Sequence, residues 1–126
     1  MELSELDYTN DQQVFDYVLE KLREQGCQSK YMGKCLYRGP DGLKCAAGHL
    51  IPDDEYDEKM EGGLLKGTYN IIYNSLVNSY FLQKGANIDL LAGLQLVHDN
   101  YWDTREEKFE RLAKWLNLTY QGQCPT

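Results

Sequence analysis

The sequence predicts a mainly α-helical protein with one small β-hairpin, which together form a single α+β domain over residues 1–126. Apolar residues recur at helical spacing in four separate stretches, and a turn rich in glycine and proline separates two short segments of alternating polarity. The length of 126 residues fits one domain of ordinary size. Hydrophobic residues make up 42% of the chain, which is enough to build a packed core.

Four substantial helices follow from the apolar periodicity. Thr9 and Gln12 have the spacing of a capping box in front of the first helix, and Asn87 can cap the third. The second helix has the strongest stripe, which runs from Tyr69 to Phe81. The predicted helices span residues 11–25, 68–84, 88–99 and 104–117, and an aperiodic tail covers 118–126.

A β-hairpin is expected over residues 34–45. At its centre, Pro40 fixes one turn dihedral angle and Gly42 can adopt a positive φ. A short helix is predicted over 46–51, and an acidic loop with six acids and one lysine is predicted over 52–63. Because an isolated hairpin is only marginally stable, we expect it to pack against the helices.

Composition and charge exclude several classes of function. Twenty acids and 13 bases give a net charge of -7, which argues against general binding to nucleic-acid backbones. No apolar run is long enough to span a bilayer, so no membrane association is expected. The first residues carry acids instead of a basic and apolar leader, which indicates a cytoplasmic protein with reduced thiols.

Positive charge is concentrated in residues 30–50, which hold four bases and one acid. Cationic side chains beside a tyrosine and several glycines can hold a phosphate or a carboxylate. The alternative is that these charges pair with the acidic loop, through Asp53, Asp54, Glu55 or Glu61. The candidate ligand-binding residues are Lys30, Lys34, Tyr37, Arg38, Lys44 and His49.

Two further kinds of site are weaker alternatives. Four soft ligands within 23 residues can hold zinc, although ordinary zinc sites space their ligands in closer pairs. Cys45 and His49 lie four residues apart, as a nucleophile and its base can on a helix, and His98 beside Asp99 can act as a base or cap its helix. The candidate metal ligands are Cys27, Cys35, Cys45 and His49. No cofactor is expected, and an enzyme is less favoured than a binding protein.

Polar residues on the second predicted helix suggest a homo-oligomer. Tyrosine hydroxyls need partners when they are buried, which places these tyrosines at the edge of the core or at a subunit interface. An uncharged polar face on the same helix can also contact a partner. The tyrosines are Tyr69, Tyr73 and Tyr80, and the polar face carries Asn70, Asn74 and Asn78.

Several runs of sequence resemble a family of small uncharacterised proteins of tailed phages and bacteria. The most specific part of this resemblance extends from Cys35 to Glu61. The runs are 33–48, 50–56 and 60–62, with further similarity at 13–16, at 94–99 and at Trp102. The resemblance implies a phage or phage-related origin and the cytoplasm of an infected cell.

Three functional hypotheses follow. The first is an accessory phage binding protein, such as an anti-defence sponge that sequesters a phosphate-bearing, nucleotide-derived signal in a preformed pocket. The second is an inhibitor of a host enzyme or defence protein that binds through the acidic stretch of residues 53–61. The third is a small hydrolytic or thiol-dependent enzyme that uses Cys45 with His49.

Overall fold

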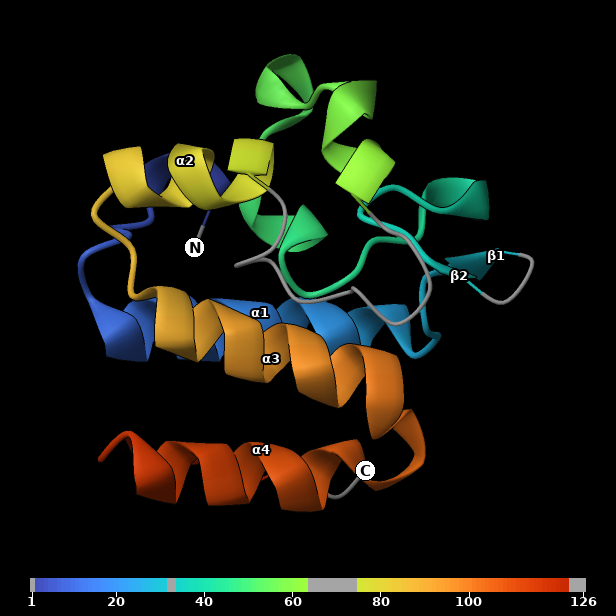
Figure 1. The fold of residues 1–126 in the computed structure, drawn as a ribbon. Helices are drawn as coiled ribbons and strands as arrows, with labels where there is room; N and C mark the ends of the chain where they lie inside the picture. Colours follow the sequence, from blue (N-terminus) through green and yellow to red (C-terminus); the bar gives the residue numbers. More distant parts are fainter. Residues whose placement is uncertain (1, 32–33, 64–74, 123–126) are drawn as a thin grey trace.

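The computed structural model describes residues 2–31, 34–63 and 75–122. Figure 1 labels the α-helices and strands of this part of the chain. The α-helices are α1 (Asp11–Gln25), α2 (Ser75–Gln83), α3 (Ile88–Asn100) and α4 (Arg105–Trp115). Residues 68–74 of the predicted second helix lie outside the described residues, and with them most of its tyrosines and asparagines.

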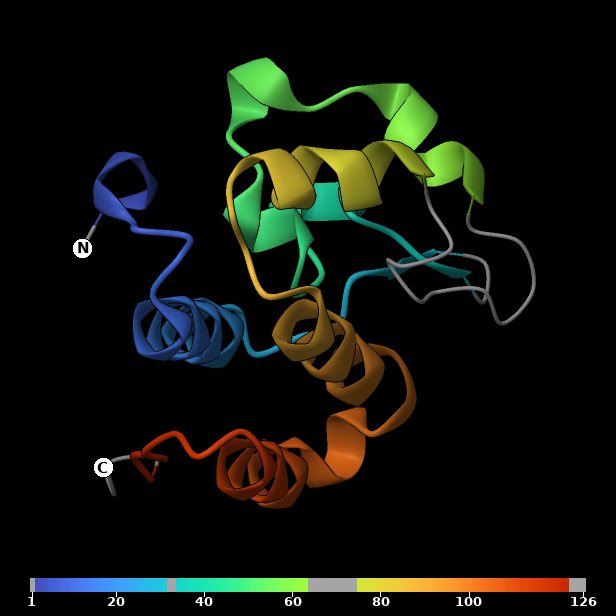
Figure 2. The ribbon, with the colours of Figure 1, turned by 60° about the vertical axis from the view of Figure 1, so that its left-hand side comes forward.

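The helices are arranged in three layers. In Figure 1, α1 and α3 lie side by side in the middle, α4 lies on one side of them, and α2 lies on the other with the turns of residues 48–63. Figure 2, which views α1, α3 and α4 nearly along their axes, shows the same separation. The central element is α3, because it contacts each of the other three helices.

Both ends of α1 have clear local causes. The Asn10 side chain accepts a hydrogen bond from the Gln13 backbone N–H at 3.1 Å, and Gly26 ends the helix with a φ of 70°. The helix therefore spans the predicted range, but Asn10 caps it in place of Thr9. The Thr9 hydroxyl instead donates to the Asp7 carboxylate at 2.6 Å.

One hydrophobic core joins the described elements. Every helix contributes buried side chains to it, as do residues 45–51. Where α3 meets α4, a Cβ built on Gly93 would lie 2.6 Å from Leu112 Cδ1, so the absence of a side chain permits close packing. The largest fully buried aliphatic and phenyl side chains are Phe15, Leu22, Leu50, Ile51, Phe81, Leu90, Leu91, Leu94 and Phe109.

The predicted α+β class is wrong, because the fold is helical and no hairpin forms over residues 34–45. Strand pairing in the described residues is limited to β1 (Lys30–Tyr31) and β2 (Lys34–Cys35), two residues each. The predicted turn is a 3-10 helix, Pro40–Gly42, in which Asp41 and Gly42 have φ of 58° and 75°.

The backbone hydrogen bonds of residues 36–38 explain why the predicted hairpin does not form. Leu36 N–H donates to Ser29 O at 3.1 Å, whereas Tyr37 and Arg38 N–H donate to the Glu61 carboxylate at 3.0 and 2.9 Å. The other predicted strand is also engaged elsewhere, since Lys44 N–H donates to Gln25 Oε1 at 3.0 Å. The Glu61 carboxylate and the Gln25 side chain thus accept the backbone hydrogen bonds that a neighbouring strand would accept in a hairpin.

Short 3-10 helices replace the predicted helix over 46–51 and the acidic loop over 52–63. They span Gly48–Leu50, Asp53–Glu55 and Glu58–Gly63. Another 3-10 helix, Trp102–Thr104, precedes α4. Of the helices in the described ranges, none is both long and apolar enough to cross a membrane.

Candidate functional site

Arg38 is tied to the chain that follows it. Its Nη1 donates to Gly48 O at 2.7 Å and its Nη2 donates to Ile51 O at 2.6 Å. The guanidinium carbon lies 4.9 Å from the centre of the Tyr56 ring. Residues 48–51 therefore fold around the guanidinium, and Arg38 has a structural role whatever else it binds.

Arg38 and Lys44 converge on one carboxylate oxygen. Asp53 Oδ1 lies 3.1 Å from Arg38 Nη2 and 3.7 Å from Lys44 Nζ. The Asp53 side chain is 86% exposed, so packing does not hold it in place. We call the two cationic groups the Arg38–Lys44 pair. Its contact with Asp53 is the charge pairing with the acidic loop that the sequence left open as an alternative.

His49 lies beside this pair and is neutral at physiological pH. Burial, followed by the nearby Lys44 charge, lowers the pKa of His49 to about 3. His49 Nε2 lies 3.0 Å from Gln25 Oε1, an atom that can only accept, so this nitrogen carries the proton. Gln25 Oε1 also accepts from the Lys44 backbone, and the Gln25 amide therefore positions both residues.

A surface hollow of about 350 Å³ adjoins the Arg38–Lys44 pair. Lys21, Lys44 and His49 line it, and Asp53 and Glu2 supply carboxylates. Its apolar lining consists of Leu3, Tyr17, Ile51 and Pro52. The hollow thus combines ammonium groups with an apolar wall, although the two carboxylates balance the charge of the lysines.

Tyr37, another predicted ligand-binding residue, does not join this group. Tyr37 is 1% exposed and faces the core, which removes the ring that was expected to stack on a ligand. Burial also raises the pKa of its hydroxyl. Lys30 is exposed on β1, and the side chain of Lys34 lies outside the described residues.

Two of the four cysteines have side chains that the structure describes, Cys27 and Cys45. Cys27 is exposed and Cys45 is buried, and both are free thiols. No group of three His, Cys, Asp or Glu side chains that could hold a metal ion occurs among the residues that the structure describes. The side chain of Cys35 lies outside them, so the four-ligand set is not tested as a whole.

The structure does not arrange either catalytic alternative, Cys45 with His49 or His98 with Asp99, for a reaction with a ligand. Burial raises the pKa of the Cys45 thiol well above its usual value, and His49 is bonded to Gln25. His98 is buried, with Nδ1 2.7 Å from Asp99 Oδ1 and Nε2 accepting from Ser29 N–H at 3.0 Å. Both nitrogens of His98 therefore serve internal bonds that hold residue 29 to the end of α3.

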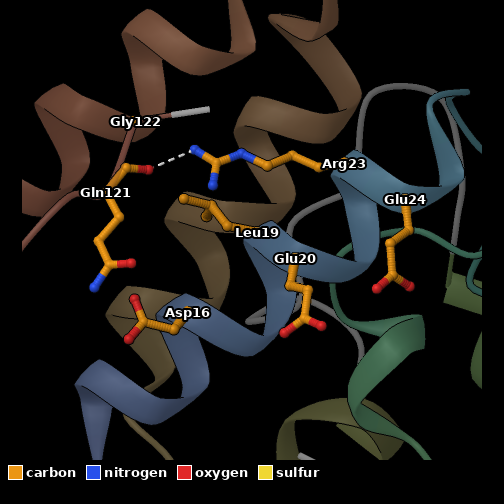
Figure 3. Close-up of a pocket in the computed structure, with 7 residues that line it drawn as sticks. All are labelled: Asp16, Leu19, Glu20, Arg23, Glu24, Gln121 and Gly122. Carbon is orange, nitrogen blue, oxygen red and sulfur yellow. Dashed lines mark hydrogen bonds between the residues drawn. The ribbon is translucent and has the colours of Figure 1, made fainter. Parts of the chain in front are cut away.

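A second hollow, of about 380 Å³, lies along α1 and is shown in Figure 3. Asp16, Glu20 and Glu24 line it, and Arg23 points from α1 toward the C-terminal segment. Arg23 Nη2 donates to Gln121 O at 2.8 Å. With three carboxylates and one guanidinium, this hollow is unsuited to an anion.

Lys21 and Gln25 were not predicted from the sequence as site residues, and Glu61 was predicted only as a partner for the cations. Lys21 lies on the polar face of α1, and Gln25 lies one turn later. Glu61 accepts from two backbone N–H groups and from the Tyr56 hydroxyl. Only Glu61 had a signal in the sequence, as one of the acids after the basic region. Nothing in the sequence indicated that it would bind backbone groups instead of a cation.

Comparison with protein-family models, with curated proteins and with solved structures found no match. The resemblance to a phage protein family therefore stays a prediction. The functional argument depends on the described residues and their chemistry alone.

Proposed function

We propose that this protein binds a small phosphate-bearing anion at the Arg38–Lys44 pair. The observation that carries the proposal is the convergence of both cations on Asp53 Oδ1, at 3.1 and 3.7 Å. A carboxylate oxygen and a phosphate oxygen are similar hydrogen-bond acceptors, and guanidinium and ammonium groups bind both. Asp53 then occupies the position that a ligand phosphate would take.

The exposure of Asp53 supports an exchange of this kind. The Arg38 side chain is 17% exposed, but the Asp53 carboxylate itself faces water, so it can leave the pair at a small cost. Arg38 keeps its bonds to the two carbonyl oxygens when Asp53 leaves, because they involve other parts of the loop. The cationic group is therefore preorganised for an incoming anion.

The adjoining hollow supports a ligand larger than phosphate. Its volume of about 350 Å³ lies within the usual range for small-molecule sites. Lys21 and Lys44 can bind further phosphate oxygens of the ligand, and the apolar wall can pack against a ring of the ligand. These features suit a nucleotide-derived ligand, which is also what an anti-defence sponge in the cytoplasm of an infected cell would sequester.

A thermal-shift series tests this function. Inorganic phosphate and a panel of linear and cyclic nucleotides are added to the wild type, to Lys44→Gln and to the control Lys59→Gln, an exposed lysine of the acidic stretch. We expect a nucleotide to raise the Tm of the wild type and of the control, and a smaller rise for Lys44→Gln. The function is excluded if no member of the panel raises the wild-type Tm.

A second candidate function is protein binding through the acidic stretch. Residues 53–55, 57 and 58 are five exposed acids on consecutive turns of the chain. Such a surface suits a basic partner, for example a host enzyme or defence protein. A homo-oligomer also stays a prediction. Tyr80, which was expected at the edge of the core or at a subunit interface, packs partly buried against the core and donates its hydroxyl to Glu55 within the same chain.

Neutralising equal numbers of acids separates this candidate from the first. Asp54→Asn, Asp57→Asn and Glu58→Gln are combined in one variant, and the control carries Asp16→Asn, Glu20→Gln and Glu24→Gln on α1. If the acidic stretch binds a protein, the first variant loses a stoichiometric partner captured from a host lysate and the control keeps it. If the two variants behave alike, the acidic stretch is not the binding surface.

A further inference from the structure

Lys84 lies in a cage of two tyrosine rings and one carboxylate. Its Nζ is 5.5 Å from the centre of the Tyr8 ring, 5.3 Å from that of Tyr80 and 3.6 Å from Glu55 Oε2. Ring faces attract cations through their quadrupole, and a carboxylate adds direct charge attraction. We call Tyr8, Tyr80 and Glu55 the tyrosine cage. Rings and a carboxylate placed in this way are typical of sites that bind organic cations. Here the ammonium group of Lys84 occupies the cage.

The walls of the cage are fixed by contacts of their own. Tyr8 is 8% exposed, and its hydroxyl donates to Leu50 O at 2.5 Å. The Tyr80 hydroxyl donates to Glu55, and its ring meets Phe81 edge-on with centroids 5.2 Å apart. None of these contacts involves Lys84. The cage therefore keeps its shape when the lysine leaves.

The occupant is held less firmly than the walls. Lys84 follows the last residue of α2, and its side chain is 36% exposed. A lysine has a flexible four-carbon stem and a strongly hydrated ammonium group, so moving it into water costs little. Of the contacts described here, only those with the cage hold its ammonium.

A hollow of about 540 Å³ opens beside the cage. Tyr8, Glu55 and Lys84 line it together with Asp7 and Asp54. Among the described residues that line it, three carry carboxylates and Lys84 is the only one with a cationic side chain. The hollow therefore favours a positively charged ligand, opposite in sign to the ligand proposed for the Arg38–Lys44 pair.

We infer that the tyrosine cage is a binding site for a small organic ammonium ion, which displaces the Lys84 side chain. A quaternary ammonium suits the cage better than a primary amine, because it is weakly hydrated and loses less when it enters between two rings. The inference stands on contacts separate from those of the Arg38–Lys44 pair, so it does not depend on the proposed function.

Nuclear magnetic resonance of the full chain tests the displacement directly. Tetramethylammonium chloride is titrated into the wild type while the ε-proton signals of Lys84 are followed, and tert-butanol serves as the neutral molecule of the same shape. We expect the Lys84 signals to begin shifted by the two rings and to move to the values of a free lysine as binding saturates. We expect tert-butanol to bind about tenfold more weakly.

Variants of the lysine and of the cage test which groups determine the affinity for tetramethylammonium. Lys84→Met removes the competing ammonium, so tetramethylammonium should bind about tenfold more tightly than to the wild type. Tyr80→Leu removes one ring and should weaken binding about tenfold. If Tyr80→Leu does not fold by circular dichroism, Glu55→Gln replaces it and should weaken binding for loss of charge. Lys59→Met, on an exposed lysine away from the cage, should bind as the wild type does.

The inference is overturned by any of three results. These are no saturable binding by Lys84→Met, equal binding of tetramethylammonium and tert-butanol, and Lys84 signals that stay in place while the ligand saturates. Each result shows that the rings and the carboxylate do not select an ammonium ion by displacing the lysine. Phosphate or nucleotide binding at the Arg38–Lys44 pair would be unaffected by any of them.

Discussion

Arg38 and Arg23 make similar bonds, but their carboxylate partners differ in exposure. Each guanidinium binds a carboxylate and at least one backbone carbonyl oxygen. Arg23 reaches Glu106 through two hydrogen bonds, of 3.0 and 2.6 Å. Two parallel bonds to one carboxylate fix its geometry as well as its charge.

The two carboxylates differ in what holds them. Glu106 is 27% exposed and accepts a further bond from the Tyr120 hydroxyl at 2.7 Å, whereas Asp53 is 86% exposed and, within the described residues, its carboxylate contacts the Arg38–Lys44 pair alone. The Arg23 region therefore joins α1, α4 and the C-terminal segment permanently. Arg38 instead holds its loop through hydrogen bonds to the carbonyl oxygens of Gly48 and Ile51, so the loop does not need the Asp53 carboxylate to stay in place.

The largest expected effect is the loss of Arg38, and the loss of Arg23 serves as the comparison. Arg38→Met strands the buried carbonyl oxygen of Ile51 and leaves that of Gly48 with the Ile51 N–H at 3.3 Å, and it should lower the free energy of unfolding by about 2–4 kcal/mol. Arg23→Met leaves a carboxylate that can still meet water, and should cost about 1–2 kcal/mol. Urea unfolding measures both variants. A greater loss for Arg23→Met would reverse the structural ranking of the two regions.

A glycine substitution in the Arg38 region comes next. A Cβ on Gly48 would lie 2.2 Å from the Tyr37 carbonyl oxygen, which is backbone and cannot easily move. Gly48→Ala should therefore destabilise the protein by about 1–3 kcal/mol. Gly122→Ala is the control beside Arg23, where a Cβ meets nothing within 4 Å, and should change stability by less than about 0.5 kcal/mol. Equal stabilities of the two variants would show that residues 37 and 48 do not meet closely.

The two regions should lose stability in different ranges of pH. The folded protein holds His49 neutral with a pKa of about 3, so unfolding takes up a proton once the pH falls below 6.5. Stability should then fall with pH by at most about 1.4 kcal/mol per unit. Arg23 lowers the pKa of Glu106 from 4.5, so its contribution is lost only as the pH falls below that value.

Unfolding of His49→Gln and Arg23→Met over pH 3 to 7 measures this difference. His49→Gln can still donate to Gln25, and we expect a shallower decline between pH 6.5 and 4.5 than in the wild type. Arg23→Met should keep the wild-type slope in that range. A wild-type slope for His49→Gln would mean that His49 gains its proton without unfolding.

The smallest expected effect concerns Lys44. Its ammonium is 3.7 Å from an exposed carboxylate, so Lys44→Gln should change the free energy of unfolding by less than about 1 kcal/mol. The same variant should bind phosphate more weakly. A large loss of stability in Lys44→Gln would make Lys44 a structural residue like Arg23.

The helices follow from local sequence, and the loop around Arg38 does not. The apolar period of residues 14–22 and the stop at Gly26 are contained within one helix, so the bounds of α1 can be inferred without the rest of the chain. Residues 36–45 show turn chemistry just as clearly. The backbone N–H groups of residues 36–38 and 44, however, bind Ser29, Glu61 and Gln25, which local patterns cannot identify.

The candidate site was predictable in charge but not in geometry. A run of bases followed by a run of acids indicated that the two would meet, and Asp53 does meet Arg38 and Lys44. The roles of Tyr37 and Lys21 depend on which way each side chain points in the folded chain. Tyr37 points into the core and Lys21 reaches the hollow from α1, and neither direction is encoded near those residues in the sequence.

Phosphate binding to an Asp53→Asn variant tests the central claim most directly. Isothermal titration with inorganic phosphate compares the wild type, Asp53→Asn and Asp54→Asn, in which the adjacent exposed acid is neutralised. If Asp53 occupies a phosphate site, Asp53→Asn should bind phosphate about tenfold more tightly than Asp54→Asn does. Equal affinities for the two variants would show that Asp53 contributes only its charge, and would contradict the account.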